Sequence, residues 1–214
     1  MQTEKLKAYI IAGAPSPDID FIRRTVDPDA FVLCADRGYA YALQAGVKPD
    51  IVIGDFDSSP VEPPDSGNVI RLPREKDYTD TVHCIDKAAQ LGYDTIVLLA
   101  ATGGRLDHTL GNLFALSFAW DRGADAVILS PKEEVRLLCE GTHAFEGRDG
   151  LTFSLFAFGC EEAVLSIRGA QYPLCHDVLR SSVPIGVSNV FTGPRCEIGI
   201  DSGRVLMVIN TVTV

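Results

Sequence analysis

The sequence has no long hydrophobic run. Its 214 residues are 46% hydrophobic and 22% charged, an ordinary balance for a globular protein. No apolar stretch approaches the roughly 20 residues that a membrane-spanning helix needs. The opening residues, MQTEKLKAYIIAG, hold an apolar stretch too short for a signal peptide, and it continues into a strand-like pattern. We therefore expect a cytosolic protein with no membrane partner.

Blocks of basic residues are also absent. The net charge is −10, and no part of the chain is rich in Lys and Arg. A general nucleic-acid binder is expected to carry a basic face, so we expect no nucleic-acid partner. An anionic ligand such as a nucleotide would be repelled by this charge. A divalent metal held by carboxylates is the usual way to offset that repulsion.

The common catalytic motifs are missing as well. The sequence contains no G-x-x-x-x-G-K-[ST] of a P-loop, no G-x-G-x-x-G dinucleotide fingerprint, no G-x-S-x-G elbow and no H-E-x-x-H zinc site. The six cysteines form no CxxC pair and no zinc-ligand spacing, so we interpret them as reduced thiols without a function. Metal-assisted phosphate chemistry without a Walker lysine is the class that remains.

The two parts of the chain have different patterns. Up to residue 133, short β-rich apolar runs alternate with helical patterns, which favours a mostly parallel sheet with flanking helices, a Rossmann-like α/β domain. The expected strands are 7–13, 30–36, 50–55, 95–101 and 125–130, and the expected helices are 39–46, 79–92 and 106–123.

Residues 134–214 show short strand-like segments separated by Gly, Pro and Asp, with no convincing helix. The segments are 134–141, 143–147, 151–159, 163–169, 196–201 and 204–212. Alternation of apolar and polar residues is clear in several of them. This pattern predicts a C-terminal antiparallel β-sandwich domain.

Polar clusters follow the predicted strands or precede the predicted helices of the first part. They are CADRG, IGDFDSS, KDYTD and ATGGRLDH. In an open parallel sheet, ligands bind beyond the carboxyl ends of the strands, so these clusters mark the candidate site. In GDFDSS, an extended chain would point Asp55 and Asp57 the same way, with Cα atoms about 7 Å apart. They could then share one hard cation, or they could cap a turn; the two residues alone leave both interpretations open.

Two more of these clusters, KDYTD and ATGGRLDH, also allow a structural and a functional interpretation. In KDYTD, Thr79 or Asp80 could be a helix N-cap; alternatively, Asp77 and Asp80 lie beside a metal and Thr79 donates to a phosphate.

In TGGRLDH, Gly103 and Gly104 would let backbone amides approach a phosphate, which Arg105 could bind bidentately. Asp107 could join the metal or orient a hydroxyl, and His108 is a minor candidate. The alternative is a tight strand-to-helix turn that carries a surface arginine.

Five short motifs together resemble the thiamine pyrophosphokinase family. They are GDFDS (54–58), DYTD (77–80), GGRLDH (103–108), YPL (172–174) and GVSN (186–189), in this order over nearly the whole chain. The resemblance implies that ATP and thiamine give thiamine diphosphate and AMP, with the β,γ-diphosphoryl group moving as a unit. It also implies Mg²⁺ as the cofactor and a homodimer whose active sites each need two chains.

The resemblance further assigns roles to residues. Asp55 and Asp57 would hold Mg²⁺, with Asp80 as a third ligand, and Arg105 would add a positive charge at the phosphates. Asp77 or Asp107 would accept or orient the hydroxyl proton. Residues 1–133 would bind ATP and metal. The ATP-binding candidates are Asp36, Arg37, Gly38, Ser58, Thr79, Gly103, Gly104, Arg105 and His108.

The resemblance gives residues 134–214 thiamine binding and dimerisation. Ser188 and Asn189 match the thiamine-side segment, and Ser181 and Ser182 lie close by in the sequence. The chain departs from the family at Asp36-Arg37-Gly38, where Asp-Gly-Gly is common, and at the tryptophan that some members place near thiamine. Trp120 is far from GVSN in the sequence, so Phe191 or another side chain would have to stack on the substrate.

Two other functions fit the same residues. One is a metal-dependent nucleotide phosphohydrolase that uses the carboxylates to activate water. The other is a non-catalytic module that binds thiamine diphosphate or a nucleotide, which would need an incomplete set of acids. Because every acid of the motifs is present, the sequence favours the kinase.

Overall fold

The computed structural model describes residues 6–57, 59–64 and 67–212. The chain forms two compact units that divide between Ser130 and Pro131. Each unit has its own hydrophobic core.

The first unit is built on parallel strands in the order β6-β5-β1-β2-β3-β4. Their bounds are β1 (Lys7–Ile11), β2 (Phe31–Ala35), β3 (Ile51–Gly54), β4 (Val69–Arg71), β5 (Thr95–Leu99) and β6 (Asp125–Leu129). The strands other than β4 are buried almost throughout, as expected for a parallel sheet covered on both faces. The mostly parallel sheet predicted from the sequence is confirmed.

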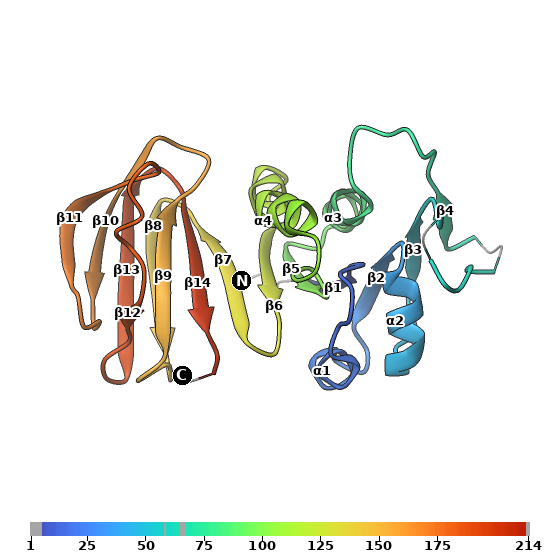
Figure 1. Ribbon diagram of the computed structural model, residues 1–214, viewed down its shortest axis with the longest axis horizontal. Coiled ribbons are helices and arrows are strands. Elements are labelled where there is room, and N and C mark those ends of the chain that lie inside the picture. Colours follow the sequence, from blue (N-terminus) through green and yellow to red (C-terminus); the bar gives the residue numbers. More distant parts are fainter. Residues whose placement is uncertain (1–5, 58, 65–66, 213–214) are drawn as a thin grey trace. The chain divides into compact units, whose positions relative to one another are not determined.

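Helices cover the two faces of this sheet (Figure 1). They are α1 (Ile19–Thr25), α2 (Gly38–Ala45), α3 (Asp80–Gln90) and α4 (Leu106–Asp121). Ile22 of α1 and Tyr41 of α2 share a core with Tyr9 and Ile11 of β1. Alternate strand residues point to the opposite face, where α3 packs against β1, β2 and β3 and also against α4. The three predicted helices are confirmed, whereas α1 and β4 were not predicted.

A close backbone contact fixes where α2 begins. At Gly38, a Cβ atom would lie 1.9 Å from the carbonyl oxygen of Ile11, so no side chain fits between α2 and β1. Only glycine allows this approach. The contact holds the turn after β2, which carries Asp36 and Arg37, against the end of β1.

The second unit consists of two antiparallel sheets, with strand orders β12-β9-β14-β7 and β11-β10-β13-β8. The bounds are β7 (Glu133–Leu138), β8 (Gly141–Glu146), β9 (Thr152–Ala157), β10 (Glu162–Arg168), β11 (Leu174–Arg180), β12 (Asn189–Val190), β13 (Arg195–Ser202) and β14 (Val205–Asn210). Inward-facing residues such as Phe153 and Met207 of one sheet pack with Leu165 and Ile198 of the other. The predicted β-sandwich is confirmed; β11 and β12 were not predicted.

No described helix is long and apolar enough to cross a membrane. The predicted cytosolic location stays a prediction. All six cysteines are free thiols, and Cys34, Cys84, Cys139 and Cys196 are buried.

Candidate functional site

The loops that follow β1, β2, β3 and β5 lie at one edge of the first unit, because the carboxyl ends of parallel strands share an edge. The loops after β1 and β5 run together. The Ala12 N–H donates to the Leu99 carbonyl (2.8 Å), and the Ala14 N–H donates to the Ala100 carbonyl (2.9 Å). A Cβ atom on Gly104 would lie 2.1 Å from Cγ of Pro15, so this glycine is needed for the contact.

The ends of β2 and β3 are joined in a similar way. The Asp36 N–H donates to the Ile53 carbonyl (2.9 Å), and a Cβ on Gly54 would lie 3.0 Å from the Asp36 Cα. Asp36 and Phe56 have positive φ angles of 45° and 60°, which non-glycine residues seldom adopt. These turns bring Asp36 and Asp55 to neighbouring strand ends.

Two predicted metal ligands converge on one lysine. The Lys76 Nζ lies 3.1 Å from Oδ2 of Asp55 and 2.5 Å from Oδ1 of Asp80. The three side chains are only 13%, 17% and 19% exposed, respectively. Carboxylates from the end of β3 and the start of α3 therefore meet at a single cation. We call Asp55 and Asp80 the acid pair.

Burial and neighbouring charges shift the pKa values of Asp55, Asp80 and Lys76. Burial raises the pKa of Asp80 above its ordinary value; Lys76 acts to lower it, and the charges of Asp55 and Asp36 act to raise it. Burial also acts to raise the pKa of Asp55, but hydrogen bonds from Lys76 and from the Asp57 N–H outweigh it and hold that pKa below its ordinary value. Burial lowers the pKa of Lys76, yet its hydrogen bonds to the acid pair more than offset this. Lys76 is therefore charged at neutral pH.

Asp57 lies beside the acid pair, but its carboxylate points to a different cation. Its Oδ2 is 3.2 Å from Nη2 of Arg74, in an exposed pair, while its backbone N–H donates to Oδ1 of Asp55 (3.3 Å). Among the described residues, no group of three or more His, Cys, Asp or Glu side chains is placed to hold a metal ion. The three-acid metal site stays a prediction, of which the structure brings two members together. Ser58 lies outside the described residues.

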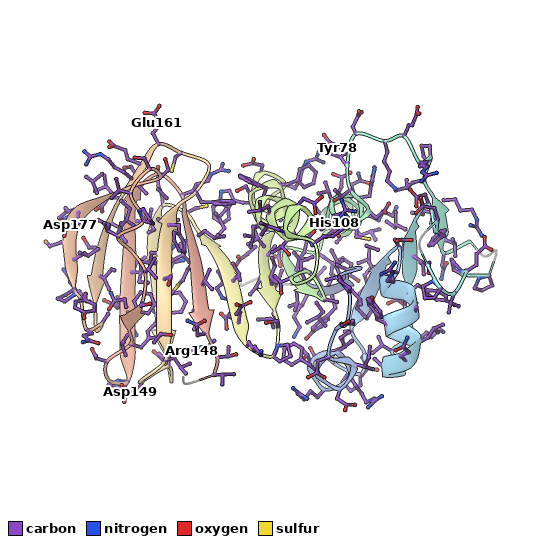
Figure 2. All side chains as sticks on the ribbon, in the orientation of Figure 1. Tyr78, His108, Arg148, Asp149, Glu161 and Asp177 are labelled. Atoms are coloured by element: carbon purple, nitrogen blue, oxygen red, sulfur yellow. The ribbon has the colours of Figure 1, made fainter. Side chains whose placement is uncertain are left out.

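The start of α3 shows the capping arrangement that the sequence allowed. Thr79 is the N-cap, and its Oγ1 accepts from the Val82 N–H (3.3 Å). Asp77 is exposed ahead of the helix. Tyr78 follows it in the loop before α3 (Figure 2), and its ring centre lies 5.8 Å from that of His83.

The turn between β5 and α4 carries an internal ion pair. Nε and Nη2 of Arg105 lie 3.1 and 2.6 Å from the two carboxylate oxygens of Asp107. The His108 N–H also donates to Asp107 (3.0 Å), and the Gly103 N–H donates to Oγ1 of Thr109 (3.2 Å). The predicted phosphate-binding arginine is thus exposed and paired within its own turn.

An apolar pocket of about 120 Å³ lies in the second unit. Its lining comes from β9 to β12, from the connection between β10 and β11 and from the segment before β12: Leu155, Ile167, Tyr172, Leu174, Leu179, Ile185, Gly186, Val187 and Asn189. Asn189, predicted to bind thiamine, lines this pocket but is buried and already bonded. Its Nδ2 donates to the Tyr172 carbonyl (2.9 Å), and its Oδ1 accepts from the N–H groups of Tyr172 (3.0 Å) and Val190 (2.8 Å).

The other thiamine candidates have different surroundings. Ser188 is exposed beside the pocket, with a φ of 63° and its N–H donating to Oγ of Ser154 (3.1 Å). Ser181 and Ser182 are exposed in the turn after β11, and neither lines the pocket. Phe191 is 1% exposed and packs in the core against Phe153, so its suggested role as a stacking partner is wrong.

Sequence reasoning missed two residues. Lys76 is the first residue of KDYTD and stands four positions before Asp80, a spacing that could have indicated the ion pair. Tyr172 belongs to the quoted YPL motif, and its 59% exposed side chain lines the pocket. An aromatic residue within a family motif is a signal that the sequence already contains.

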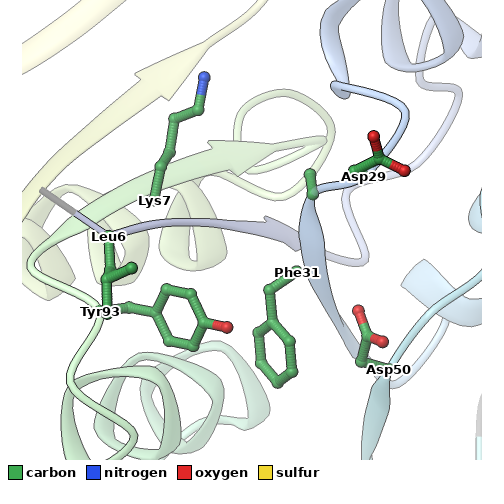
Figure 3. A pocket seen from close by; sticks show the side chains of 7 residues that line it. Leu6, Lys7, Asp29, Phe31, Asp50 and Tyr93 are labelled. Atoms are coloured by element: carbon green, nitrogen blue, oxygen red, sulfur yellow. The ribbon is translucent and has the colours of Figure 1, made fainter. Parts of the chain in front are cut away.

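A second cavity of about 340 Å³ lies at the opposite, amino-end edge of the first unit (Figure 3). Phe31, at the start of β2, and Tyr93 stack there with ring centres 4.6 Å apart, and Asp29 and Asp50 lie on the rim. It contains none of the predicted site residues.

Two family models match the chain, one in each unit. The model for the thiamin pyrophosphokinase catalytic domain matches residues 22–128, and the model for the thiamin pyrophosphokinase vitamin B1 binding domain matches residues 142–205. The chain belongs to the thiamine pyrophosphokinase family. The first match contains Asp55, Lys76 and Asp80, and the second contains the apolar pocket.

Relatives support membership of this thiamine pyrophosphokinase family. The thiamine pyrophosphokinase of Bacillus subtilis is 27% identical over 94% of this chain and 97% of its own length. Thiamine pyrophosphokinase 1 of Arabidopsis thaliana is 29% identical over 76% of this chain and 66% of its own length.

Solved structures show the same fold. The crystal structure of the Bacillus subtilis enzyme has a TM-score of 0.83 at 23% identity, covering 96% of this chain and 99% of that one. The structure from Geobacillus thermodenitrificans has a TM-score of 0.82 at 24% identity, covering 97% and 99%.

Proposed function

We propose that this chain is a thiamine pyrophosphokinase that transfers the β,γ-diphosphoryl group of ATP to the hydroxyl of thiamine, giving thiamine diphosphate and AMP. The observation that carries the proposal is the convergence of Asp55 and Asp80 on one cation, within the part of the chain that matches the family's catalytic domain. The apolar pocket supports it from the part that matches the vitamin B1 binding domain.

The acid pair fits a divalent metal ion. Its two carboxylates already bind one positive group, the Lys76 ammonium, and carboxylate oxygens are the ligands that Mg²⁺ prefers. Asp55 and Asp80 would hold the ion, and Asp57 would join them by exchanging Arg74 for it. When bound, Mg²⁺ supplies positive charge to the transferring phosphate oxygens.

The turn after β5 is proposed to bind the phosphates. Arg105 is exposed, and its guanidinium can exchange the Asp107 carboxylate for a phosphate group, since both accept two parallel hydrogen bonds. Gly103 and Gly104 have positive φ angles of 100° and 69° and are exposed, and neither adds a side chain of its own to the turn. The Asp107 carboxylate, once released, is a candidate to accept the thiamine hydroxyl proton, as is exposed Asp77.

The pocket of the second unit is proposed to hold part of thiamine. Its walls are apolar, and Tyr172 presents an exposed aromatic ring, which suits a flat cationic thiazolium. Asn189 would act by holding the Tyr172 backbone in place, and Ser188 is the exposed polar group beside it. We also propose a homodimer, in which exposed Ile185 and Val187 at this pocket are covered by the partner subunit.

The test is to incubate the purified protein with ATP, thiamine and Mg²⁺ and to separate the products by chromatography. We expect AMP and thiamine diphosphate in equal amounts, and neither product when thiamine or Mg²⁺ is omitted. Release of inorganic phosphate without thiamine would instead identify a phosphohydrolase. Binding of thiamine diphosphate without any turnover would identify a non-catalytic module.

A further inference from the structure

Lys76 has an unusual environment for a lysine. Most lysine side chains reach into water, and a buried lysine ammonium is normally paired with an acidic group. The Lys76 side chain is 13% exposed, and its ammonium contacts two carboxylates, at 3.1 and 2.5 Å. Asp55 comes from the end of β3 and Asp80 from the start of α3, so this one lysine links two elements at the carboxyl edge.

The contacts of Lys76 are with the two residues that would hold the metal ion. The Lys76 ammonium takes one oxygen of each carboxylate, Oδ2 of Asp55 and Oδ1 of Asp80, and it repels any other cation nearby. A divalent cation that binds these two oxygens must therefore displace the ammonium. We propose that Lys76 is the internal counter-ion of the acid pair, and that a divalent cation binds between Asp55 and Asp80 by displacing the Lys76 ammonium. The proposal rests on the proposed function for the identity of that cation.

Displacement of the Lys76 ammonium affects the bare metal ion and the metal–nucleotide complex differently. A metal ion that arrives alone must separate Lys76 from both acids, and it brings no anion of its own for the freed ammonium. A metal ion that arrives with a nucleotide brings phosphate oxygens, and the flexible lysine side chain can donate to them. Lys76 therefore weakens binding of the bare ion and strengthens binding of the metal–nucleotide complex.

The first measurement is a Mn²⁺ titration of the nucleotide-free full chain, followed by electron paramagnetic resonance. Because metal affinity rises with the net negative charge of the ligands, Lys76→Gln should bind Mn²⁺ about tenfold more tightly than the wild type. Lys76→Arg keeps the charge and should stay within about twofold of the wild type. Lys87→Gln, a matched charge loss in the last turn of α3, should also stay within about twofold. Unchanged or weaker Mn²⁺ binding by Lys76→Gln would overturn the proposal.

The second measurement is calorimetric titration of the same variants with Mg–ATP in the absence of thiamine. Here Lys76→Gln should bind about tenfold more weakly, because the phosphates lose one charged donor. Tighter binding of Mn²⁺ alone together with weaker binding of Mg–ATP is expected only if Lys76 moves from the carboxylates to the phosphates when the metal–nucleotide complex binds. A fold defect would weaken both, and changes of the same sign would overturn the proposal. Neither titration requires turnover, so a wild type that releases no AMP would refute the proposed function while leaving this test intact.

Discussion

The candidate sites of the two units differ in their chemistry. The site of the first unit consists of charged groups at the end of β3 and at the starts of α3 and α4, where Asp55, Lys76 and Asp80 form ion pairs and Arg105 pairs with Asp107. The pocket of the second unit is mostly apolar, and the Asn189 amide that lines it is bonded to backbone groups. The proposed function assigns the reaction to the charged site of the first unit and substrate recognition to the apolar pocket of the second.

The largest expected effect tests the charged side of this comparison. Asp55→Asn removes one member of the acid pair, so turnover should fall at least about 100-fold, the scale expected when a group that stabilises transition-state charge is lost. The KM for thiamine should stay near the wild-type value. Steady-state kinetics with varied thiamine measure both. A raised KM with normal turnover would mean that the two regions have been given the wrong roles.

A smaller effect concerns the backbone contacts that build each region. At Gly38 a Cβ would lie 1.9 Å from the Ile11 carbonyl oxygen, and at Gly186 it would lie 2.2 Å from the Leu155 carbonyl oxygen. Gly38→Ala and Gly186→Ala should each lower the free energy of unfolding by about 1–3 kcal/mol, because the backbone must move.

Gly111→Ala is the matched control for these two variants. Gly111 lies within α4, and a Cβ added there would meet no atom within 4 Å, so alanine should stabilise the helix by about 0.5–1 kcal/mol. Urea unfolding compares the three variants. Equal free energies of unfolding for Gly38→Ala and Gly111→Ala would show that the close contact between Gly38 and Ile11 does not constrain the residue at position 38.

The smallest expected effect tests the apolar side. Tyr172→Ala should raise the KM for thiamine about tenfold through loss of a ring that faces the pocket, with turnover unchanged. Tyr172→Phe keeps the ring and should behave as the wild type. Asn189→Ala should also raise this KM, because the backbone N–H of Tyr172 loses its acceptor. If the KM for ATP rose instead, the pocket would have been assigned to the wrong substrate.

Much of the fold could be predicted, because buried strands and long helices leave clear periodic patterns. The elements that were not predicted have weak periodic patterns. Helix α1 has seven residues, β4 has three, and β11 carries mostly exposed side chains, so none shows a full apolar repeat. Short or exposed elements depend on tertiary contacts that one sequence does not display.

The candidate site was predictable to the extent that topology determines it. Asp55 and Asp80 meet because the end of β3 and the start of α3 share one edge, as the alternating pattern implied. Apart from the four-residue spacing of Lys76 and Asp80, the sequence carries no signal for the partner of each charge. Lys76 between the acids, Arg74 on Asp57 and Asp107 on Arg105 depend on side-chain geometry. The burial of Phe191 likewise follows from packing between the two sheets of the second unit.

The central claim is that Asp55 and Asp80 serve one shared cation. A double-mutant cycle with Asp55→Asn and Asp80→Asn, read as Mn²⁺ affinity of the nucleotide-free protein, tests it most directly. If the carboxylates share the ion, the double variant should lose clearly less than the sum of the two single losses in binding free energy, because the first substitution already removes most of the site. Strictly additive losses would show that the two acids act independently and would contradict the account.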